Sequence, residues 1–262
     1  MIGYHLQNAL RNELIAREMP TQVGALVCQV LVDESDPAFQ KPEKPVGGYL
    51  SPEEADLLRE RGQTVMEDAG RGLRRAVPSP EPIGLVEAEL IKALADTNAV
   101  LIVGGGGGIP VVNKNSRYEG VEAVIDKDKS AGLIAELIDA DFFLVLTGVE
   151  KVALNYGTPD ETWLEETSTE EMERYIQEGH FAPGSMLPKI EAAVIFAKSK
   201  TGRMSLITSL DKAGSSLAGR TGTRVSSHRP RSVIDAPTRK GNNMKHISKR
   251  LVTLGSAFWV DF

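Results

Sequence analysis

The segment Phe181-Ala-Pro-Gly-Ser-Met-Leu-Pro-Lys189 places a Gly-Ser turn and a lysine at the start of an apolar helix. Backbone N–H groups at a helix start attract anions, and a lysine there adds a positive charge. The same pattern is also typical of an ordinary helix cap. Two earlier segments favour an anion site, because Val124-Ile-Asp-Lys-Asp128 and the glycine run 104–108 also border apolar strands or helices. Together the three segments predict one phosphate-handling site, built from loops of an α/β sheet.

Apolar runs of strand character alternate with helical patterns along most of the chain. The expected strands are 23–32, 99–103, 142–147 and 204–208, and the expected helices are 51–62, 86–95, 130–138, 168–179 and 189–200. Two of these helices begin with capping boxes, Ser51-Pro-Glu-Glu54 and Ser168-Thr-Glu-Glu171. The alternation predicts an α/β fold in which an open, mostly parallel sheet is sandwiched by helices.

The segment 33–82 differs in texture from the rest of the chain. It holds seven of the fourteen prolines, and it carries Lys41, Lys44, Arg71, Arg74 and Arg75 near Gly47, Gly48 and Gly70. Long insertions of this kind in α/β domains are commonly lids over a site. We therefore expect a small protruding lid subdomain over about residues 33–82.

Composition is that of a water-soluble globular protein. The 262 residues are 41% hydrophobic and 25% charged, and no apolar run approaches membrane-span length, so we expect no membrane partner. The first nineteen residues have the pattern of an amphipathic helix and lack the apolar core of a signal peptide. The single Cys28 excludes an intramolecular disulfide and favours a reducing cytoplasm. Because Cys28 lies in an apolar run, a buried filler is expected rather than a nucleophile.

Charge divides the chain unevenly near residue 224. Residues 224–262 carry eight Lys or Arg against Asp235 and Asp261, a net charge of +6, whereas the remainder carries 22 basic and 34 acidic side chains, a net charge of −12. Such a step is typical of a domain end. The basic segment could be a nucleic-acid arm, but it has no aromatic interleaving and no fold signature before Phe258 and Trp259. We therefore expect a domain over 1–223, a disordered tail over 224–262 and no nucleic-acid partner.

Eight motifs occur in an order that is typical of one family. They are Asp36-Pro-Ala-Phe39, Lys44-Pro-Val-Gly47, Glu67-Asp-Ala-Gly-Arg-Gly72, Gly105-Gly-Gly-Gly-Ile-Pro110, Val124-Ile-Asp-Lys-Asp128, Leu146-Thr-Gly-Val-Glu-Lys-Val152, Gly179-His-Phe-Ala-Pro-Gly-Ser-Met-Leu-Pro-Lys189 and Gly219-Arg-Thr-Gly-Thr223. In this order they resemble bacterial carbamate kinase over about residues 1–225. The resemblance implies the amino-acid-kinase fold, an α/β sandwich that is usually a homodimer. It also implies phosphoryl transfer between carbamoyl phosphate and ADP, making ATP in cytoplasmic arginine breakdown.

The resemblance assigns four residues to the chemistry. Lys127 and Lys189 match the phosphate-contacting lysines, and Asp128 matches the aspartate that would orient them, with Asp126 beside it. Lys44 matches a lid lysine that would reach the carbamoyl phosphate. The residues alone leave open a solvated helix start for the Asp-Lys-Asp triplet and an exposed loop position for Lys44.

Further residues match the substrate-binding loops of the family. The nucleotide would lie against Thr147, Val149, Lys151, Gly184, Ser185 and Met186. Gly105, Gly106, Gly107 and Gly108 could approach a substrate closely because they lack side chains, although a glycine run is equally compatible with a strained strand end. ATP or ADP with Mg²⁺ is implied, and no metal-ligating side chains are expected.

Two family features are not found before the first motif. Family members begin with a strand and a Gly-Gly-Asn-Ala loop, followed by a Gly-Asn-Gly-Pro-Gln loop, whereas Met1-Ile-Gly-Tyr4 aligns with an interior helix. The sequence therefore also predicts an alternative: a truncated, catalytically impaired remnant that at most dimerises through its N-terminal helix or binds nucleotide. A related amino-acid kinase with another acceptor is a third reading, and the lid motif argues against it.

Overall fold

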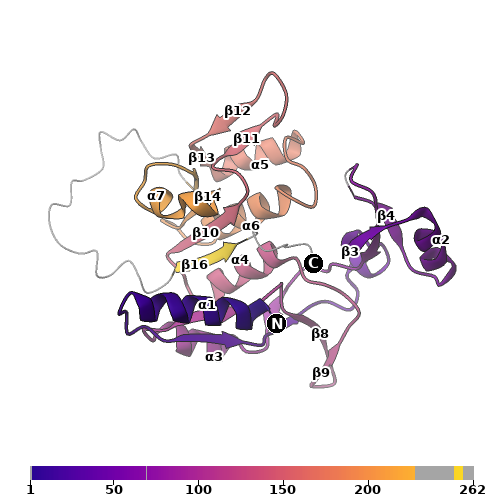
Figure 1. Ribbon diagram of the computed structural model, residues 1–262, viewed down its shortest axis with the longest axis horizontal. Coiled ribbons are helices and arrows are strands. Elements are labelled where there is room, and N and C mark those ends of the chain that lie inside the picture. Colours follow the sequence, from indigo (N-terminus) through magenta and orange to yellow (C-terminus); the bar gives the residue numbers. More distant parts are fainter. Residues whose placement is uncertain (1, 69, 228–250, 256–262) are drawn as a thin grey trace.

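The apolar run Phe142–Thr147 forms β10, the strand that organises the C-terminal half of the fold. The computed structural model describes residues 2–68, 70–227 and 251–255 of the chain (Figure 1). In it, β10 belongs to a five-stranded sheet with the order β13-β15-β14-β10-β16. Its other strands are β13 (Glu166–Ser168), β15 (Thr223–Ser226), β14 (Met204–Ser209) and β16 (Leu251–Gly255). Three of the four pairings are parallel, and only β14 with β15 is antiparallel.

Helices cover both faces of this sheet because successive side chains of a strand point to opposite sides. Phe143 and Val145 join a core with α4 (Lys127–Leu137), α5 (Thr169–Gln177) and α6 (Leu187–Lys198). Leu144 and Leu146 pack on the other side, where Ala213 begins α7 (Ala213–Leu217) after η2 (Leu210–Lys212). The expected α/β sandwich is confirmed, and the capping box at the start of α5 is present with both of its hydrogen bonds.

The N-terminal half contributes two smaller sheets, β1-β7 and β6-β2-β8-β9. Its elements are α1 (Ile2–Ala16), β1 (Val23–Leu26), β2 (Gln29–Leu31), η1 (Pro37–Phe39), β6 (Gly84–Leu85), α3 (Ala88–Ala95), β7 (Val100–Val103), β8 (Ile109–Lys114) and β9 (Arg117–Gly120). The expected single strand over 23–32 is wrong. The chain breaks at Val27, which is 78% exposed, so β1 and β2 join different sheets.

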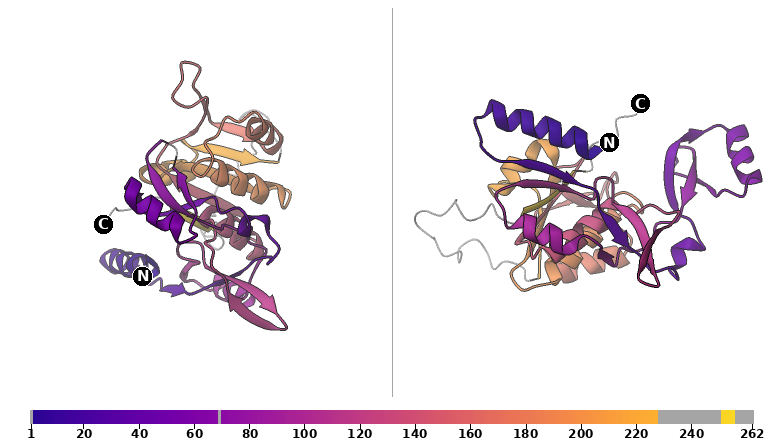
Figure 2. Two further views of the ribbon diagram at one scale, coloured as in Figure 1. Left: turned by 90° about the vertical axis from the view of Figure 1, so that its right-hand side faces the viewer. Right: turned by 90° about the horizontal axis from the view of Figure 1, so that it is seen from below.

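A three-stranded antiparallel unit stands away from the rest of the molecule (Figures 1 and 2). It has the order β3-β5-β4, built from β3 (Lys44–Leu50), β4 (Val65–Glu67) and β5 (Leu73–Val77), with α2 (Pro52–Glu60) between the first two. The predicted capping box at Ser51 begins α2. We call residues 44–77 the protruding unit; it lies inside the segment for which a lid was expected.

Two strands fall within the segment that was expected to be a disordered tail. Thr223–Ser226 forms β15, and the backbone of Leu251–Gly255 pairs in parallel with β10 as β16. The expectation for residues 228–250 and 256–262 lies outside the described residues. A hairpin of β11 (Val152–Leu154) and β12 (Thr162–Leu164) completes the fold. None of the helices described here combines the length and the apolar character that crossing a membrane requires.

Replacing Phe196 by Ala tests the packing between α6 and the sheet. Phe196 is fully buried, and its ring lies 5.6 Å from that of Phe143 between centroids. Loss of a buried aromatic ring leaves a cavity, so the variant is expected to lose about 3–5 kcal/mol of unfolding free energy in urea denaturation. Ile195→Ala, at a 57% exposed position of the same helix, is the control and is expected to lose much less. Equal losses in the two variants would contradict this account of the core.

Candidate functional site

The first turn of α4 carries the predicted Asp-Lys-Asp segment. Asp126 is the N-cap, and its Oδ1 accepts the backbone N–H groups of Asp128 and Lys129 at 2.9 and 3.3 Å. The helix therefore begins at Lys127, three residues earlier than the sequence pattern predicted. Asp126 is 7% exposed and Asp128 is 2% exposed, so this turn is not a solvated helix start.

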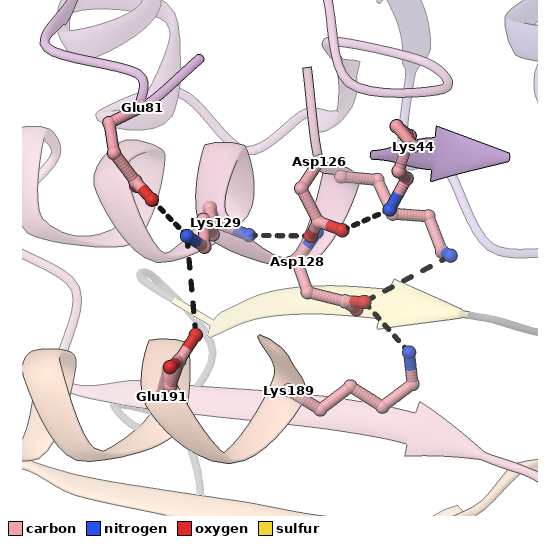
Figure 3. A network of polar contacts seen from close by, with 8 residues as sticks. Lys44, Glu81, Asp126, Asp128, Lys129, Lys189 and Glu191 are labelled. Carbon is pink, nitrogen blue, oxygen red and sulfur yellow. Dashed lines mark hydrogen bonds and ion pairs between the residues drawn. The ribbon is translucent and has the colours of Figure 1, made fainter. Parts of the chain in front are cut away.

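A buried ion pair joins α4 to α6 at this point (Figure 3). The Lys189 ammonium donates to Asp128 Oδ2 at 2.7 Å, and the two side chains are 8% and 3% exposed. The Lys127 ammonium lies 3.9 Å from the same oxygen, with its side chain 30% exposed. Asp128 thus holds two lysines from different helices on one carboxylate, which is the arrangement that the resemblance implied for these three residues. Asp128 Oδ1 has no partner among the described residues.

The fourth predicted residue, Lys44, reaches the same cluster from the protruding unit. Its ammonium donates to Asp126 Oδ2 at 2.5 Å, across 82 positions of sequence. The Lys44 side chain is 28% exposed, so it is not a free loop lysine. The structure therefore brings all four predicted catalytic residues together, with three lysines around two carboxylates. The excess positive charge suits a dianionic phosphate.

A second set of charges next to this cluster was not predicted from the sequence. Lys129 forms an ion pair with Glu81 and lies 4.0 Å from Glu191 (Figure 3). Glu81 lies in the chain between the protruding unit and α3, whereas Glu191 is on α6. The sequence offered one local indication of this second set, namely that Lys129 directly follows the Asp-Lys-Asp triplet. The two glutamates come from distant segments and carry no motif.

Burial and charge shift the pKa of three groups here. Burial lowers the pKa of Lys127 below the usual lysine value; Asp128 opposes this shift and the neighbouring Lys189 adds to it. Burial alone would raise the pKa of Asp126, but Lys44 and the helix N–H groups hold it below its ordinary value. Burial raises the pKa of Glu191, with Lys129 opposing and Glu81 adding. These directions keep Asp126 ionised and make Lys127 lose its proton more readily than an ordinary lysine does.

A cavity of about 340 Å³ lies between the protruding unit and the body. Lys44, Asp126 and Lys129 line it together with Gly184 and Pro188 from the start of α6. Gly184 has a φ of +73°, which turns the chain into α6, and Ser185 and Met186 complete that turn. The N–H of Leu187 donates to Ala182 and that of Lys189 to Met186. Pro188 has no N–H, so of residues 187–189 it is the Lys189 side chain that supplies positive charge at the start of α6.

The remaining predicted nucleotide residues follow the carboxyl end of β10. Thr147 is the last residue of β10 and is buried, whereas Val149 and Lys151 lie in the loop that leads to β11. Lys151 donates to Glu165 at 2.6 Å, so its ammonium is held by a neighbouring segment. Glu150 in the same loop accepts a hydrogen bond from Thr221, which belongs to the last predicted motif. Loops at the carboxyl ends of strands commonly bind ligands in α/β sheets.

The glycine run has a packing role that the structure makes explicit. A Cβ on Gly107 would lie 2.3 Å from the carbonyl oxygen of Ile125, and one on Gly108 would lie 2.4 Å from Val30. Both glycines also have positive φ, at +133° and +94°. A Cβ on Gly105 would make an ordinary contact and one on Gly106 would meet nothing. Both glycines therefore approach their own chain: Gly107 next to Ile125, which precedes Asp126, and Gly108 next to Val30.

Replacing Gly107 by Ala is expected to destabilise the fold near Asp126. The new Cβ collides with backbone rather than with a flexible side chain, and its φ is unfavourable for L-residues, so a loss of about 1–3 kcal/mol is expected in urea unfolding. Gly106→Ala is the matched control, because a Cβ on Gly106 would meet no other atom and its φ is not positive. A Gly107 variant as stable as the Gly106 variant would show that the loop does not need this close approach.

Comparison with known proteins places this architecture in one family. Residues 9–208 match the model of the amino acid kinase family, and the chain belongs to that family. It is 53% identical to the carbamate kinase-like protein YqeA of Escherichia coli K12, covering 86% of this chain and 72% of that protein. It is 48% identical to carbamate kinase of Clostridium perfringens, over the same shares of the two chains. Among solved structures, carbamate kinase from Giardia lamblia bound to AMP-PNP superimposes with a TM-score of 0.77 at 44% identity, covering 86% of this chain and 72% of that one.

Proposed function

We propose that this protein is a carbamate kinase, which transfers a phosphoryl group between carbamoyl phosphate and ADP and so makes ATP. The observation that carries the proposal is the cluster of Lys127, Lys189 and Asp128 at the junction of α4 and α6. It occurs in a chain about half identical to several proteins named carbamate kinase. Following the resemblance, we place the reaction in arginine catabolism.

The chemistry of phosphoryl transfer fits this cluster. The moving group carries negative charge that must be offset by fixed cations, and the reactants must be held in line. Lys127 and Lys189 are held by one buried carboxylate, so their ammonium groups are oriented before a ligand arrives. Lys44 supplies a third cation from the base of the protruding unit, where it is paired with Asp126 and lines the cavity.

The nucleotide is proposed to lie along Thr147, Val149 and Lys151 on one side and Gly184, Ser185 and Met186 on the other. A relative of the same fold binds the ATP analogue AMP-PNP, which supports a nucleotide substrate. Mg²⁺ keeps several of its waters and usually binds through substrate phosphates, so we propose that it enters with the nucleotide. It would offset charge on the transferred group.

The protruding unit is proposed to act as the lid of the site, inside the predicted lid segment 33–82. It contributes Lys44 to the cavity and stands on the body through a narrow base (Figure 1). Gly105, Gly106, Gly107 and Gly108 are proposed to border the substrate on the body side, with Gly106 the most open of the four. The domain is proposed to include β15 and the backbone of Leu251–Gly255 rather than to end near residue 223, because both segments pair within the central sheet.

We also propose that the protein is a cytoplasmic homodimer. On α1, only Leu14 is buried, whereas four large apolar side chains are more than a third exposed: Ile2, Tyr4, Leu6 and Ile15. Apolar side chains gathered on one helix are typical of an interface. Sedimentation of a monomer at all concentrations would contradict this assignment.

Replacing Lys127 or Lys189 by Ala tests the proposed reaction. Each change removes an oriented cation, so kcat for ADP phosphorylation by carbamoyl phosphate with Mg²⁺ is expected to fall about 10²–10³-fold. Lys198→Ala is the matched control, because Lys198 lies on α6 with Lys189 but its pair with Glu173 is exposed. Unchanged turnover in both site variants would remove these lysines from the reaction. An unmodified chain that binds nucleotide without turnover would favour the impaired-remnant alternative.

The lowered pKa of Lys127 predicts an alkaline limit to activity. Since burial favours the neutral amine, Lys127 loses its charge at a lower pH than an ordinary lysine, whose pKa is about 10.4. The pH profile of kcat/KM reports ionisations of the free enzyme. Its decline on the alkaline side is expected to be centred at a pH lower than about 10.4. The fall in kcat is expected at higher pH, because bound phosphate favours the ammonium form. The assignment would be contradicted if kcat and kcat/KM declined at the same pH. It would also be contradicted if both declined only above the pKa of an ordinary lysine.

A further inference from the structure

Asp126 uses both of its carboxylate oxygens, for different purposes. Oδ1 caps α4 by accepting two backbone N–H groups, whereas the donor to Oδ2 among the described residues is the Lys44 ammonium. A helix cap requires one side-chain oxygen, and Asn caps a helix about as well as Asp. The second oxygen and the negative charge of Asp126 are therefore not explained by the helix alone.

The pair between Lys44 and Asp126 lies where the protruding unit joins the body. Lys44 is the first residue of β3, and its register partner on β5 is Val77, the last residue of the unit. Pro78, the next residue, accepts a hydrogen bond from the N–H of Val124 at 3.0 Å. Both chain segments at the base of the unit are thus tied to residues 124–126, one through backbone and one through an ion pair.

The ion pair between Lys44 and Asp126 is partly shielded from water, which strengthens the attraction between its charges. The Asp126 side chain is 9% exposed, whereas that of Lys44 is 28% exposed and lines the cavity together with Gly184. Both residues line the cavity, and the carboxylate is the more buried of the two, so the ion pair leaves part of the Lys44 side chain exposed there. Charge pairs that are shielded from water couple their partners more strongly than surface pairs do.

We propose that Asp126 is a positioning residue that fixes Lys44, and with it the base of the protruding unit, beside the phosphate-handling cluster. The same carboxylate caps the helix that begins with Lys127 and Asp128, so one side chain sets the position of the unit relative to those two residues. The expected effect of Asp126 on the kinetics rests on the proposed function. Its expected effect on the structure, a fixed protruding unit, does not depend on that function.

Four variants of the full chain test the proposal: Asp126→Asn, Lys44→Met, their double variant and the control Glu173→Gln. Asn keeps the helix cap but removes the charge that holds Lys44. Glu173→Gln removes the charge of another lysine–carboxylate pair, 2.7 Å long and exposed, away from the cavity. Hydrogen exchange of the backbone is measured over 44–50 and 73–77 without ligand, and KM and kcat are measured with carbamoyl phosphate.

Asp126→Asn and Lys44→Met are each expected to speed exchange over these strands and to raise KM for carbamoyl phosphate at least about fivefold, with a smaller change in kcat. The double variant is expected to resemble Lys44→Met, because both changes remove one interaction. Glu173→Gln is expected to leave exchange and KM as they are.

Unchanged hydrogen exchange and KM in Asp126→Asn would overturn the proposal. It would also be overturned if the rise in KM of the double variant were the product of the rises in the two single variants. Loss of thermal stability in Asp126→Asn without faster exchange in the protruding unit would also overturn it, since that result is expected of a helix cap alone. An unmodified chain without kinase activity would refute the proposed function, whereas the exchange data would still decide the role of Asp126.

Discussion

The buried ion pair between Asp128 and Lys189 is the contact on which the site depends. It joins the first turns of α4 and α6, the two helices that pack together over the central sheet. Removing one partner of such a pair leaves an unpaired charge in the interior, which is far more costly than losing an exposed pair. The same two groups are therefore required for the packing of the helices and for the placement of the cations. Lys127 shares this carboxylate, so its ammonium depends on the same contact.

The glycine run 104–108 supports this contact from the body, and at Gly107 it has no space for a side chain. Gly107 lies against the carbonyl of Ile125, and Ile125 precedes the residue that caps α4. Side chains on that part of the loop would displace the start of the helix and the lysines that it carries. Gly107 thus acts on the site by permitting a close backbone approach, in addition to the substrate contact that we propose for this loop. The protruding unit contributes Lys44 to the neighbouring carboxylate, Asp126.

Local patterns predicted much of the fold correctly. The run Phe142–Thr147 matches β10 at both ends, and Ser51 and Ser168 cap their helices as expected. These features depend on interactions within a few residues, such as side-chain alternation and the return of a glutamate to its cap. The split of 23–32 at Val27 was not predicted, because an apolar run does not say which of its residues leaves the sheet. The strand at Leu251–Gly255 was missed because its pairing partner β10 is more than a hundred residues away.

The amino-acid sequence by itself determined the class of fold, the resemblance to one family of kinases, and the lysines and aspartate that we propose for the site. It did so because those residues lie in short, ordered motifs whose neighbours fix local structure. Only the tertiary structure decided which carboxylate holds which lysine: Asp128 takes Lys189 from α6, and Asp126 takes Lys44 from the protruding unit. It also placed Glu81 and Glu191 around Lys129. Such partners are set by the packing of distant segments, and charge pairing between them leaves no local signal in the sequence.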